Sequence, residues 1–419
     1  MSIPEFITPQ FVASMITIFV ILHLALGAGA YLILLERKVA AWVQDRVGPN
    51  RTGPLGLLQP IADGLKLLVK EEFIPRGVDK ALFILAPALT VMPALIAFAV
   101  IPWGGVLDTS TIPFAETLGI AGHEVKIMGA DVHIGIVYLL AATSLGVYGI
   151  TLGGWASNNK YSFLGGMRAG AQMISYEIPM GVALLTVVLM TGAVRGDEII
   201  GQQLEGQWFL VHQPIAALLF YICLLAEANR APFDLAEAEQ ELVGGWHTEY
   251  SSMKWALFFL GEYTNLVFGS AFFVLLFMGG WSLNPFFGWD LPAGGGILMI
   301  LLQVAVVLGK VFILIFLTMM IRWTLPRFRF DQLMRLAWEA MIPTALIVLL
   351  ATSFAVFMGW TSSMWLISLV MIIGLYVLYP FLPKQADPNH RVPLIGSRFS
   401  PLRESDVGAS GSGPPSKGP

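Results

Sequence analysis

The sequence predicts an all-α, polytopic membrane protein with about nine transmembrane helices, an amphipathic interfacial helix, the N-terminus outside and the C-terminus inside. Three observations lead to this fold class. The 419-residue chain is 56% apolar and only 12% charged, and its mean hydropathy is +0.73. Its apolar residues gather in separate runs of about 20, the length that crosses a bilayer. This composition excludes an ordinary soluble domain of the same length.

The apolar runs follow one another with no soluble domain between them. The expected spans are residues 14–35, 81–102, 132–153, 173–194, 208–227, 255–280, 297–321, 340–358 and 364–382. The first ten residues hold no Lys or Arg, so we expect the first span to stay as an anchor. Residues 1–383 form the predicted bundle, and residues 384–419 end in a Gly-, Ser- and Pro-rich stretch that predicts a disordered cytoplasmic tail.

The positions of Lys and Arg predict the orientation, because cytoplasmic loops retain positive charge. The loops after spans 1, 3, 5 and 7, together with the C-terminal tail, hold 21 of the 24 basic residues. The opposite side holds Lys126 and Arg195 only, and Lys310 lies within a span. An odd number of helices, with the N-terminus outside and the C-terminus inside, accounts for every one of these charges.

A shorter amphipathic pattern separates the first two spans, over residues 54–73. Gln59, Asp63, Lys66 and Lys70 recur at helical spacing, opposite a face of leucine and isoleucine. This pattern predicts a helix that lies along the membrane interface.

Several classes of function are excluded by what the sequence lacks. One cysteine, Cys223, cannot make an internal disulfide, a Cys-ligated iron–sulfur cluster or a structural zinc site. No histidine set has metal-ligand spacing, and His23 is expected to be a core residue. The net charge of −4 and the missing phosphate-binding loop argue against nucleic acid and nucleotides. Electron transfer would therefore need partner subunits.

Charged residues inside the hydrocarbon layer are the strongest functional signal, since each costs at least about 2.5–3.5 kcal/mol at a helix centre unless it is paired or hydrated. Glu262 lies eight residues past Lys254, about 12 Å deep, and Lys310 lies twelve residues before Arg322, about 18 Å deep. We interpret both as members of a proton path. The alternative is a structural ion pair or an interhelical hydrogen bond.

A second signal is the acidic segment at residues 227–249, on the side where the topology favours positive charge. Its six acids are Glu227, Asp234, Glu237, Glu239, Glu241 and Glu249. A solvated loop is the ordinary explanation of such a run. Interleaved apolar residues favour a loop that folds back onto the bundle; they are Phe233, Leu235, Leu242, Val243 and Trp246. Carboxylates crowded there would exchange protons as a coupled set.

Three charged positions lie at the cytoplasmic ends of spans. Glu177 follows Tyr176 near the mouth of span 4, where a relay member and an interface anchor are both consistent with the sequence. Arg37 and Lys38 at the end of span 1 are explained by the positive-inside topology. The negative charge of Glu36 beside them opposes that explanation and suggests a second role. The basic stretch from Arg322 to Arg335 is expected to be a positive-inside loop.

Long ordered segments of the chain resemble the H subunit of respiratory complex I. They are LERKVAAWVQDRVGPNR at residues 35–51, LQPIADGLKL at 58–67 and EANRAPFDLAE at 227–237, with shorter matches at 154–161, 175–177 and 325–334. The resemblance runs from about residue 14 to 358. It implies the membrane subunit that joins the two arms of a proton-pumping NADH-quinone oxidoreductase in the inner (cytoplasmic) membrane.

The resemblance also implies roles for individual residues. Lining of the quinone chamber is implied for Arg37, Asp63, Lys66, Glu71, Phe233 and Asp234. A chain of carboxylates leading from that chamber is implied for Glu177, Glu227, Glu237, Glu239, Glu241, Glu249 and Glu262. The expected partners are the other complex I subunits, ubiquinone or menaquinone as substrate, and lipid; neither a bound cofactor nor nucleic acid is expected. Asp131, at the start of span 3, is a further candidate member of the relay.

Two departures and two alternatives stay open at the level of sequence. The family pattern has eight spans, so the ninth span and the tail are interpreted as peripheral packing or assembly features. The related membrane anchor of energy-converting hydrogenases has the same fold, and neighbouring genes would distinguish it. A free-standing cation/proton transporter would also need Glu262 and Lys310 inside the membrane. The lack of a transporter-type internal repeat argues against it.

Overall fold

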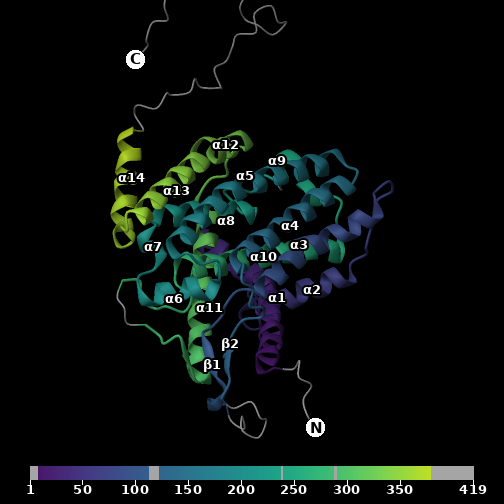
Figure 1. The fold of residues 1–419 in the computed structure, drawn as a ribbon. Coiled ribbons are helices and arrows are strands. Elements are labelled where there is room, and N and C mark those ends of the chain that lie inside the picture. Colours follow the sequence, from purple (N-terminus) through teal and green to yellow (C-terminus); the bar gives the residue numbers. More distant parts are fainter. Residues whose placement is uncertain (1–7, 113–121, 237–238, 287–289, 379–419) are drawn as a thin grey trace, which may run out of the picture. The chain divides into compact units, whose positions relative to one another are not determined.

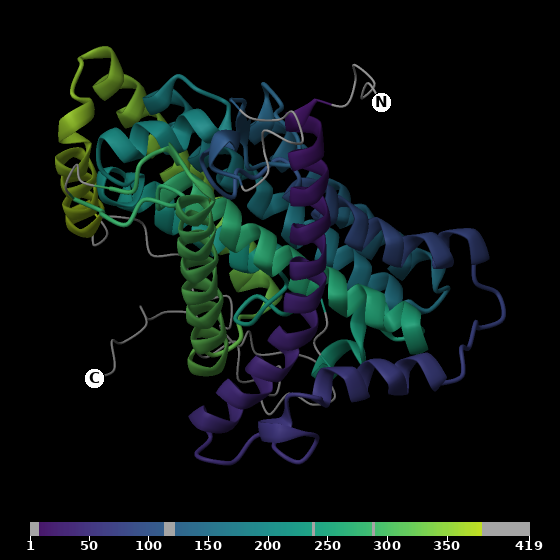
Figure 2. The ribbon, with the colours of Figure 1, turned by 90° about the horizontal axis from the view of Figure 1, so that it is seen from below.

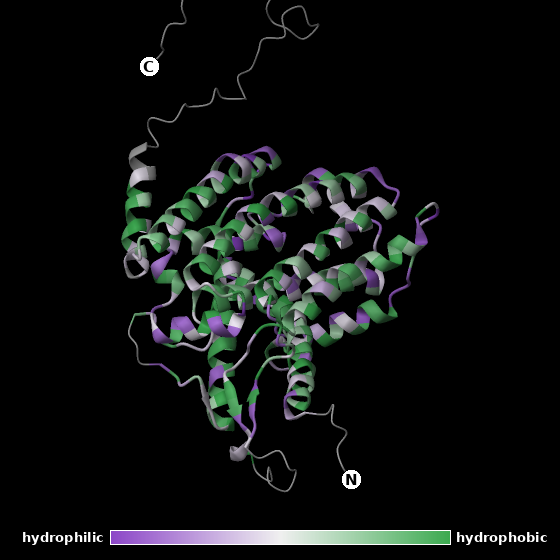
Figure 3. Ribbon diagram, in the orientation of Figure 1, coloured by the Kyte–Doolittle hydropathy of each residue, from purple (hydrophilic) through white to green (hydrophobic). Residues whose placement is uncertain are grey.

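The computed structural model describes residues 8–112, 122–236, 239–286 and 290–378. Seven helices of this part are long and apolar enough to cross a membrane. They are α1 (Pro9–Val43), α3 (Lys80–Phe98), α4 (Gly135–Ala156), α5 (Lys160–Thr191), α10 (Ser252–Phe277), α11 (Ile297–Thr324) and the continuous run of α12 (Phe330–Arg335), a π-helical turn (Leu336–Met341) and α13 (Ile342–Phe357). The predicted all-α membrane fold is confirmed, and Figure 3 shows the hydrophobic residues along α11.

The remaining elements are short. Two shorter apolar helices are α8 (Pro214–Glu227) and α14 (Met364–Leu378), and the other helices are α2 (Gln59–Val69), α6 (Gly196–Glu205), α7 (Phe209–His212) and α9 (Glu239–Leu242). One small sheet has the order β2 (Glu124–Lys126), β1 (Val106–Asp108), β3 (Gly294–Gly295), with β1 antiparallel to β2 and parallel to β3. Turns of 3₁₀-helix cover Pro54–Gly56, Thr109–Thr111, Gly245–His247 and Thr361–Ser363.

Several predicted boundaries were wrong. The fourth span was expected from residue 173, but α5 begins at Lys160, where the Asn159 side chain accepts from the backbone of Tyr161 at 2.9 Å. The fifth was expected from 208, but the chain breaks at Gln213 and α8 begins with Pro214 at its first turn. Proline disfavours a helical conformation in the residue before it, which separates α7 from α8. Residues 379–419, with the predicted tail, lie outside the described residues.

Within residues 1–370, which form one compact unit, the long helices pack in a regular order. Helix α4 lies between α3 and α5, while α8 and α13 pack against α5 (Figure 1). Helix α10 packs against both α1 and α3. Figure 2 shows α2 crossing beside the C-terminal part of α1 and the start of α10. A helix is thus present within the predicted range 54–73, over Gln59–Val69, and its place along the membrane interface stays a prediction. The orientation of the termini stays a prediction.

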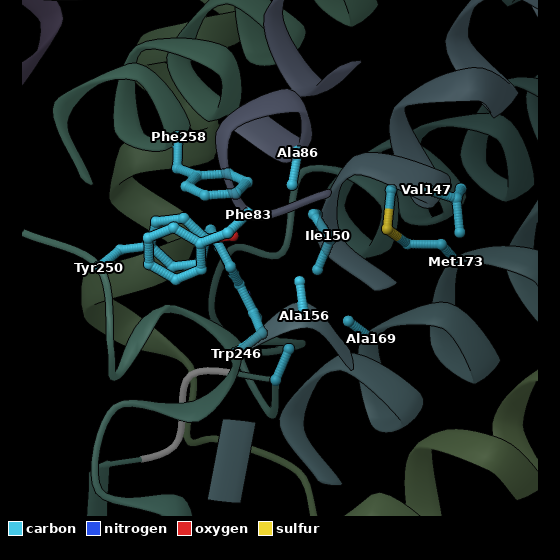
Figure 4. Packing of buried hydrophobic residues seen from close by; sticks show 11 residues of the cluster. Phe83, Ala86, Val147, Ile150, Ala156, Ala169, Met173, Trp246, Tyr250 and Phe258 are labelled. Carbon is cyan, nitrogen blue, oxygen red and sulfur yellow. The ribbon is translucent and has the colours of Figure 1, made fainter. Parts of the chain in front are cut away.

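The acidic segment after α8 folds back onto this bundle, as predicted. Ala236 and Trp246 are fully buried in a core cluster with Phe83 of α3, Ile150 of α4 and Phe258 of α10. Figure 4 shows Trp246 and Tyr250 facing Phe83 and Phe258, and the Phe83 and Tyr250 rings stack at a centroid distance of 4.0 Å.

The burial predicted for the apolar residues of the segment is confirmed for four of them, Phe233, Leu235, Leu242 and Trp246. It is wrong for Val243, which is 60% exposed. That residue adopts a left-handed backbone conformation (φ +68°), so the reversal of the chain there turns its side chain outward.

Candidate functional site

The C-terminal part of α1 carries a buried acid that several elements converge on. The Glu36 carboxylate accepts a hydrogen bond from the Tyr263 hydroxyl at 2.5 Å and from the Arg230 guanidinium at 3.4 Å. The Arg322 guanidinium of α11 donates to its other oxygen. Glu36 therefore links α1 to α10, to α11 and to the segment after α8.

Arg230 lies between two acids and is only 5% exposed. Besides Glu36, it faces Glu262 of α10, with an Nη2–Oε2 distance of 3.8 Å, and its guanidinium lies 4.2 Å from the centre of the Tyr263 ring. We call Glu36, Arg230, Glu262, Tyr263 and Arg322 the buried ion cluster. The negative charges of its two carboxylates are balanced by the positive charges of its two guanidinium groups. Buried charges are stable only when they are paired in this way.

A polar cavity of about 430 Å³ adjoins the buried ion cluster. We call it the arginine cavity; its lining is Ile33, Glu36, Arg37, Ala40, Arg46, Pro49, Arg230, Phe259, Tyr263, Arg322 and Trp323. Four arginines line this space; Arg230 and Arg322 pair with acids of the buried ion cluster and Arg37 pairs with Asp63, and their remaining N–H groups with those of Arg46 make the lining rich in hydrogen-bond donors. It suits a ligand with oxygen acceptors or negative charge.

A second cavity, of about 260 Å³, lies between α1, α2 and α10. We call it the α2 cavity; its lining is Ala30, Ile33, Leu34, Arg37, Gln59, Pro60, Asp63, Gly64, Lys66, Leu67, Trp255, Ala256, Phe259 and Leu260. The two cavities share Ile33, Arg37 and Phe259. Mostly apolar space therefore adjoins polar space across these three side chains.

The structure brings together three of the residues assigned to the quinone chamber by resemblance. Arg37 donates to Asp63 at 2.8 Å, Lys66 lies 3.6 Å from the same carboxylate, and all three line the α2 cavity. Glu71 follows the end of α2, is exposed, and is not part of that lining.

Phe233 and Asp234 lie outside the lining of both cavities. The Phe233 ring packs between Tyr176 and Phe328, and Asp234 pairs with Arg327 at 2.8 Å. Their role in the chamber stays a prediction.

Among the described acids of the 227–249 segment, Glu241 and Glu249 have separate partners. Glu241 pairs with Arg168 at 2.6 Å, and Glu249 accepts from the Asn159 amide at 2.5 Å. Glu227, at the end of α8, instead lies near enough to Glu177 of α5 to interact electrostatically. Glu237 and the side chain of Glu239 lie outside the described residues. The carboxylates that the structure brings together are thus Glu177 with Glu227 and Glu36 with Glu262.

Lys310 of α11 lies apart from the buried ion cluster, beside the C-terminal end of α10. That end of α10 is about 24 Å along the helix from Glu262. Its ammonium donates to the carbonyls of Met278 at 2.5 Å, Gly280 at 2.8 Å and Ser282, and it faces the Trp208 ring at 4.1 Å. Left-handed φ angles at Gly279 and Gly280 turn these carbonyls inward. A cation at a helix C-terminus is electrostatically favourable. The proton-path role of Lys310 stays a prediction.

Sequence reasoning did not place Glu36, Arg322 or Arg230 in a site. The charges near Glu36 and Arg322 were explained by topology, and Arg230 was quoted only within a matching segment. The signal that could have found Glu36 was an acid inside a positive-inside loop, which the sequence already identified as unusual.

A second ionic network joins the chain segments that topology predicts to lie outside. Lys126 pairs with Asp131 at 3.0 Å and with Asp197 at 2.7 Å, and Arg195 pairs with Asp131 at 2.8 Å. Partial burial disfavours the charge of Asp197, but hydrogen bonds from Lys126 and Arg195 outweigh it and lower the pKa of this carboxyl. Asp131 is therefore an ion-pair partner here, and its role in a relay stays a prediction.

This ionic network predicts that the local stability of these segments depends on pH only under acidic conditions. Because the folded pKa of Asp197 is depressed, its stabilisation is complete above the unfolded value of about 3.9 and is lost as pH falls through the folded pKa. Hydrogen exchange of residues 122–131 and 195–205 in membranes should stay constant from pH 8 to 5, after correction for intrinsic rates, and rise below pH 4. Asp197→Asn should lower the free energy of local opening at pH 7 by about 1 kcal/mol or less, and hydrogen exchange should become faster accordingly. Equal protection in both proteins would contradict the prediction.

Comparison with known proteins fits this arrangement. The family described as NADH dehydrogenase matches residues 16–353. The NADH-quinone oxidoreductase H subunit 1 of Cytophaga hutchinsonii is 44% identical over 337 residues, 80% of this chain and 94% of that protein. Its namesake in Geobacter sulfurreducens is 46% identical over 348 residues, 82% and 94% of the two chains. The NADH-quinone oxidoreductase H subunit of Protochlamydia amoebophila is 48% identical over 327 residues, 78% and 92%.

The match begins within α1, extends through most of α13 and includes every residue of the buried ion cluster. The ninth predicted span and the tail lie beyond it. The chain belongs to the family of NADH-quinone oxidoreductase H subunits, and is thus a multi-pass membrane subunit of that respiratory enzyme complex.

Proposed function

We propose that this chain forms the quinone entrance and the membrane side of the quinone chamber in a proton-pumping NADH-quinone oxidoreductase. The observation that supports this best is the pair of adjoining cavities, one mostly apolar and one rich in arginine. An isoprenoid tail suits the α2 cavity, and a headgroup with carbonyl oxygens suits donors such as Arg37. Ubiquinone and menaquinone both fit this description.

The surroundings of α2 support access from the lipid. The helix turns Asp63 and Lys66 toward the cavity, while Ile61, Leu65 and Leu68 on its other side are more than half exposed. Such a helix buries its apolar face in the membrane interface. A hydrophobic quinone would then pass between α1 and α2, and its headgroup would be reduced in a neighbouring subunit that carries the redox centres, because no bound cofactor is expected in this chain.

The acids supply the proposed coupling to proton movement. Negative charge arriving with the reduced headgroup would act first on the buried ion cluster, where Glu36 and Glu262 share Arg230. Glu177 and Glu227 would continue the path toward the adjacent membrane subunits. The proposed location is the inner membrane with the N-terminus outside, consistent with Lys126 and Arg195 being the basic residues of the opposite side.

Filling the α2 cavity tests the proposal. An added Cβ at Gly64 meets no atom within 4 Å, and the residue lines the cavity, so Gly64→Trp should occupy it without disturbing the helix. Quinone-dependent turnover of the assembled complex should fall about tenfold or more, because the tail can no longer pass. NADH oxidation with a soluble electron acceptor should be unchanged.

Leu65→Trp is the matched control, since Leu65 lies on the opposite, exposed face of α2. It should keep normal turnover with quinone. Normal turnover in Gly64→Trp, with the complex fully assembled, would rule out this passage.

A further inference from the structure

Two groups of acids on the proposed path are separated by one short segment of chain. Glu227 ends α8 beside Glu177, and Arg230, three residues later, belongs to the buried ion cluster. The segment from Ala226 to Phe233 thus runs from one group to the other. This segment is therefore the stretch of chain that connects the two groups of acids.

Gln172 of α5 holds this segment from the side. Its amide nitrogen donates to the carbonyls of Ala226 and Phe233, both at 2.8 Å, and lies 3.2 Å from the Asn229 side-chain oxygen. Asn229 adopts a left-handed backbone conformation (φ +47°), which is unfavourable for a residue with a side chain unless its surroundings fix it. The Gln172 amide supplies that fixation at both ends of the turn.

The oxygen of the same side-chain amide is in a different situation from its nitrogen. Gln172 is fully buried, and its Oε1 atom has no hydrogen-bond partner among the described residues. The three acceptors around the nitrogen determine which way the amide faces, so this oxygen must point away from the segment. A buried acceptor in polar surroundings is normally satisfied, and ordered water is the usual partner when no protein group reaches it.

We propose that Gln172 is a positioning residue of the proton path, fixing the Ala226–Phe233 turn through its nitrogen and holding a buried water through its oxygen. The water would lie on the side of Gln172 that faces away from this turn. This inference rests on the proposed path of acids and adds to it a residue that fixes the turn between the two groups of acids.

Substitution of Gln172 in the assembled complex tests the role. Gln172→Leu keeps the approximate shape but removes donor and acceptor, and should lower the number of protons pumped per quinone reduced by at least half. Gln172→Glu keeps shape and acceptor, and its protonated form restores one donor. The number of protons that this variant pumps per quinone reduced should therefore be near normal at low pH and fall as pH rises. The wild-type protein should not show this fall.

Gln213→Leu is the matched control. Gln213 is equally buried, donates to Thr352, and also has an unpartnered Oε1 among the described residues, but it lies at the other end of α8. It should leave both coupling and pH profile unchanged. A uniform loss in Gln172→Glu at every pH would reduce Gln172 to a packing residue and overturn the inference.

Two further measurements keep the result independent of folding and of the proposed path. A density map of the complex that resolves buried waters should show one within about 3 Å of Gln172 Oε1, and an empty position there would overturn the proposal. Glu227→Gln is the reference: if it leaves pumping unchanged, the proposed path itself fails. If it abolishes pumping while Gln172→Leu pumps normally, only the inference about Gln172 fails.

Discussion

Replacing Arg230 with methionine is expected to lower the stability of the protein by about 3–5 kcal/mol, because it takes the shared cation away from Glu36 and Glu262. Arg322 still pairs with Glu36, so the loss of the shared cation acts mainly on Glu262, which is buried in α10. The assembled complex should lose thermal stability and accumulate poorly. The apparent unfolding temperature and the amount of complex in membranes measure this.

Two further variants separate charge from size in that experiment. Arg168→Met removes the same kind of side chain from a half-exposed pair with Glu241, and should cost about 1 kcal/mol at most. Adding Glu262→Gln to Arg230→Met removes the stranded charge and should restore part of the stability. Equal losses in the two arginine variants, with no recovery in the double variant, would show that the cluster does not hold buried charge.

Lys310→Met is the second substitution with a large expected effect. It leaves the carbonyls of Met278, Gly280 and Ser282 without their donor, at about 1–3 kcal/mol for each buried acceptor that finds no substitute. The turn that follows α10 should open. Faster hydrogen exchange is expected at its amides, which now bond to the carbonyls of Val274 and Gly279.

Exposed Lys160, at the start of α5, provides the control, and Lys160→Met should leave these amides protected. Lys310→Arg distinguishes a structural role of Lys310 at the end of α10 from a role in the proton path. A guanidinium keeps the positive charge but does not release its proton. Protected amides with lost pumping would assign Lys310 to the proton path. Protected amides with normal pumping would leave it as a structural cap.

The fold was predictable to the extent that hydropathy determines it. Runs of apolar residues located all the long helices, and the 3.6-residue period located α2. Hydropathy reports which residues lie in lipid, not where a helix begins, so it missed the thirteen residues by which α5 precedes the expected span. The Asn159 cap was the available signal. The Gln213–Pro214 break in the fifth span was likewise visible in the sequence.

The site was less predictable, for a different reason. Resemblance named Arg37, Asp63 and Lys66, and these do meet. The buried ion cluster, however, joins Glu36 to residues 194, 227 and 286 positions away, and no local pattern encodes such contacts. Counting the charges of each loop explains Arg322 as part of the positive-inside pattern. The count cannot show that the Arg322 side chain pairs with the Glu36 carboxylate.

The same long separations constrain how the chain is made. A ribosome delivers Glu36 to the bilayer early and Arg322 only after nearly three hundred further residues, as the sixth of the seven long helices is completed. Until then the first helix carries an acid that lacks its final counterion. We therefore expect α1 to settle into its mature position late in biogenesis, with its acid end kept at the aqueous boundary while the intervening helices are inserted.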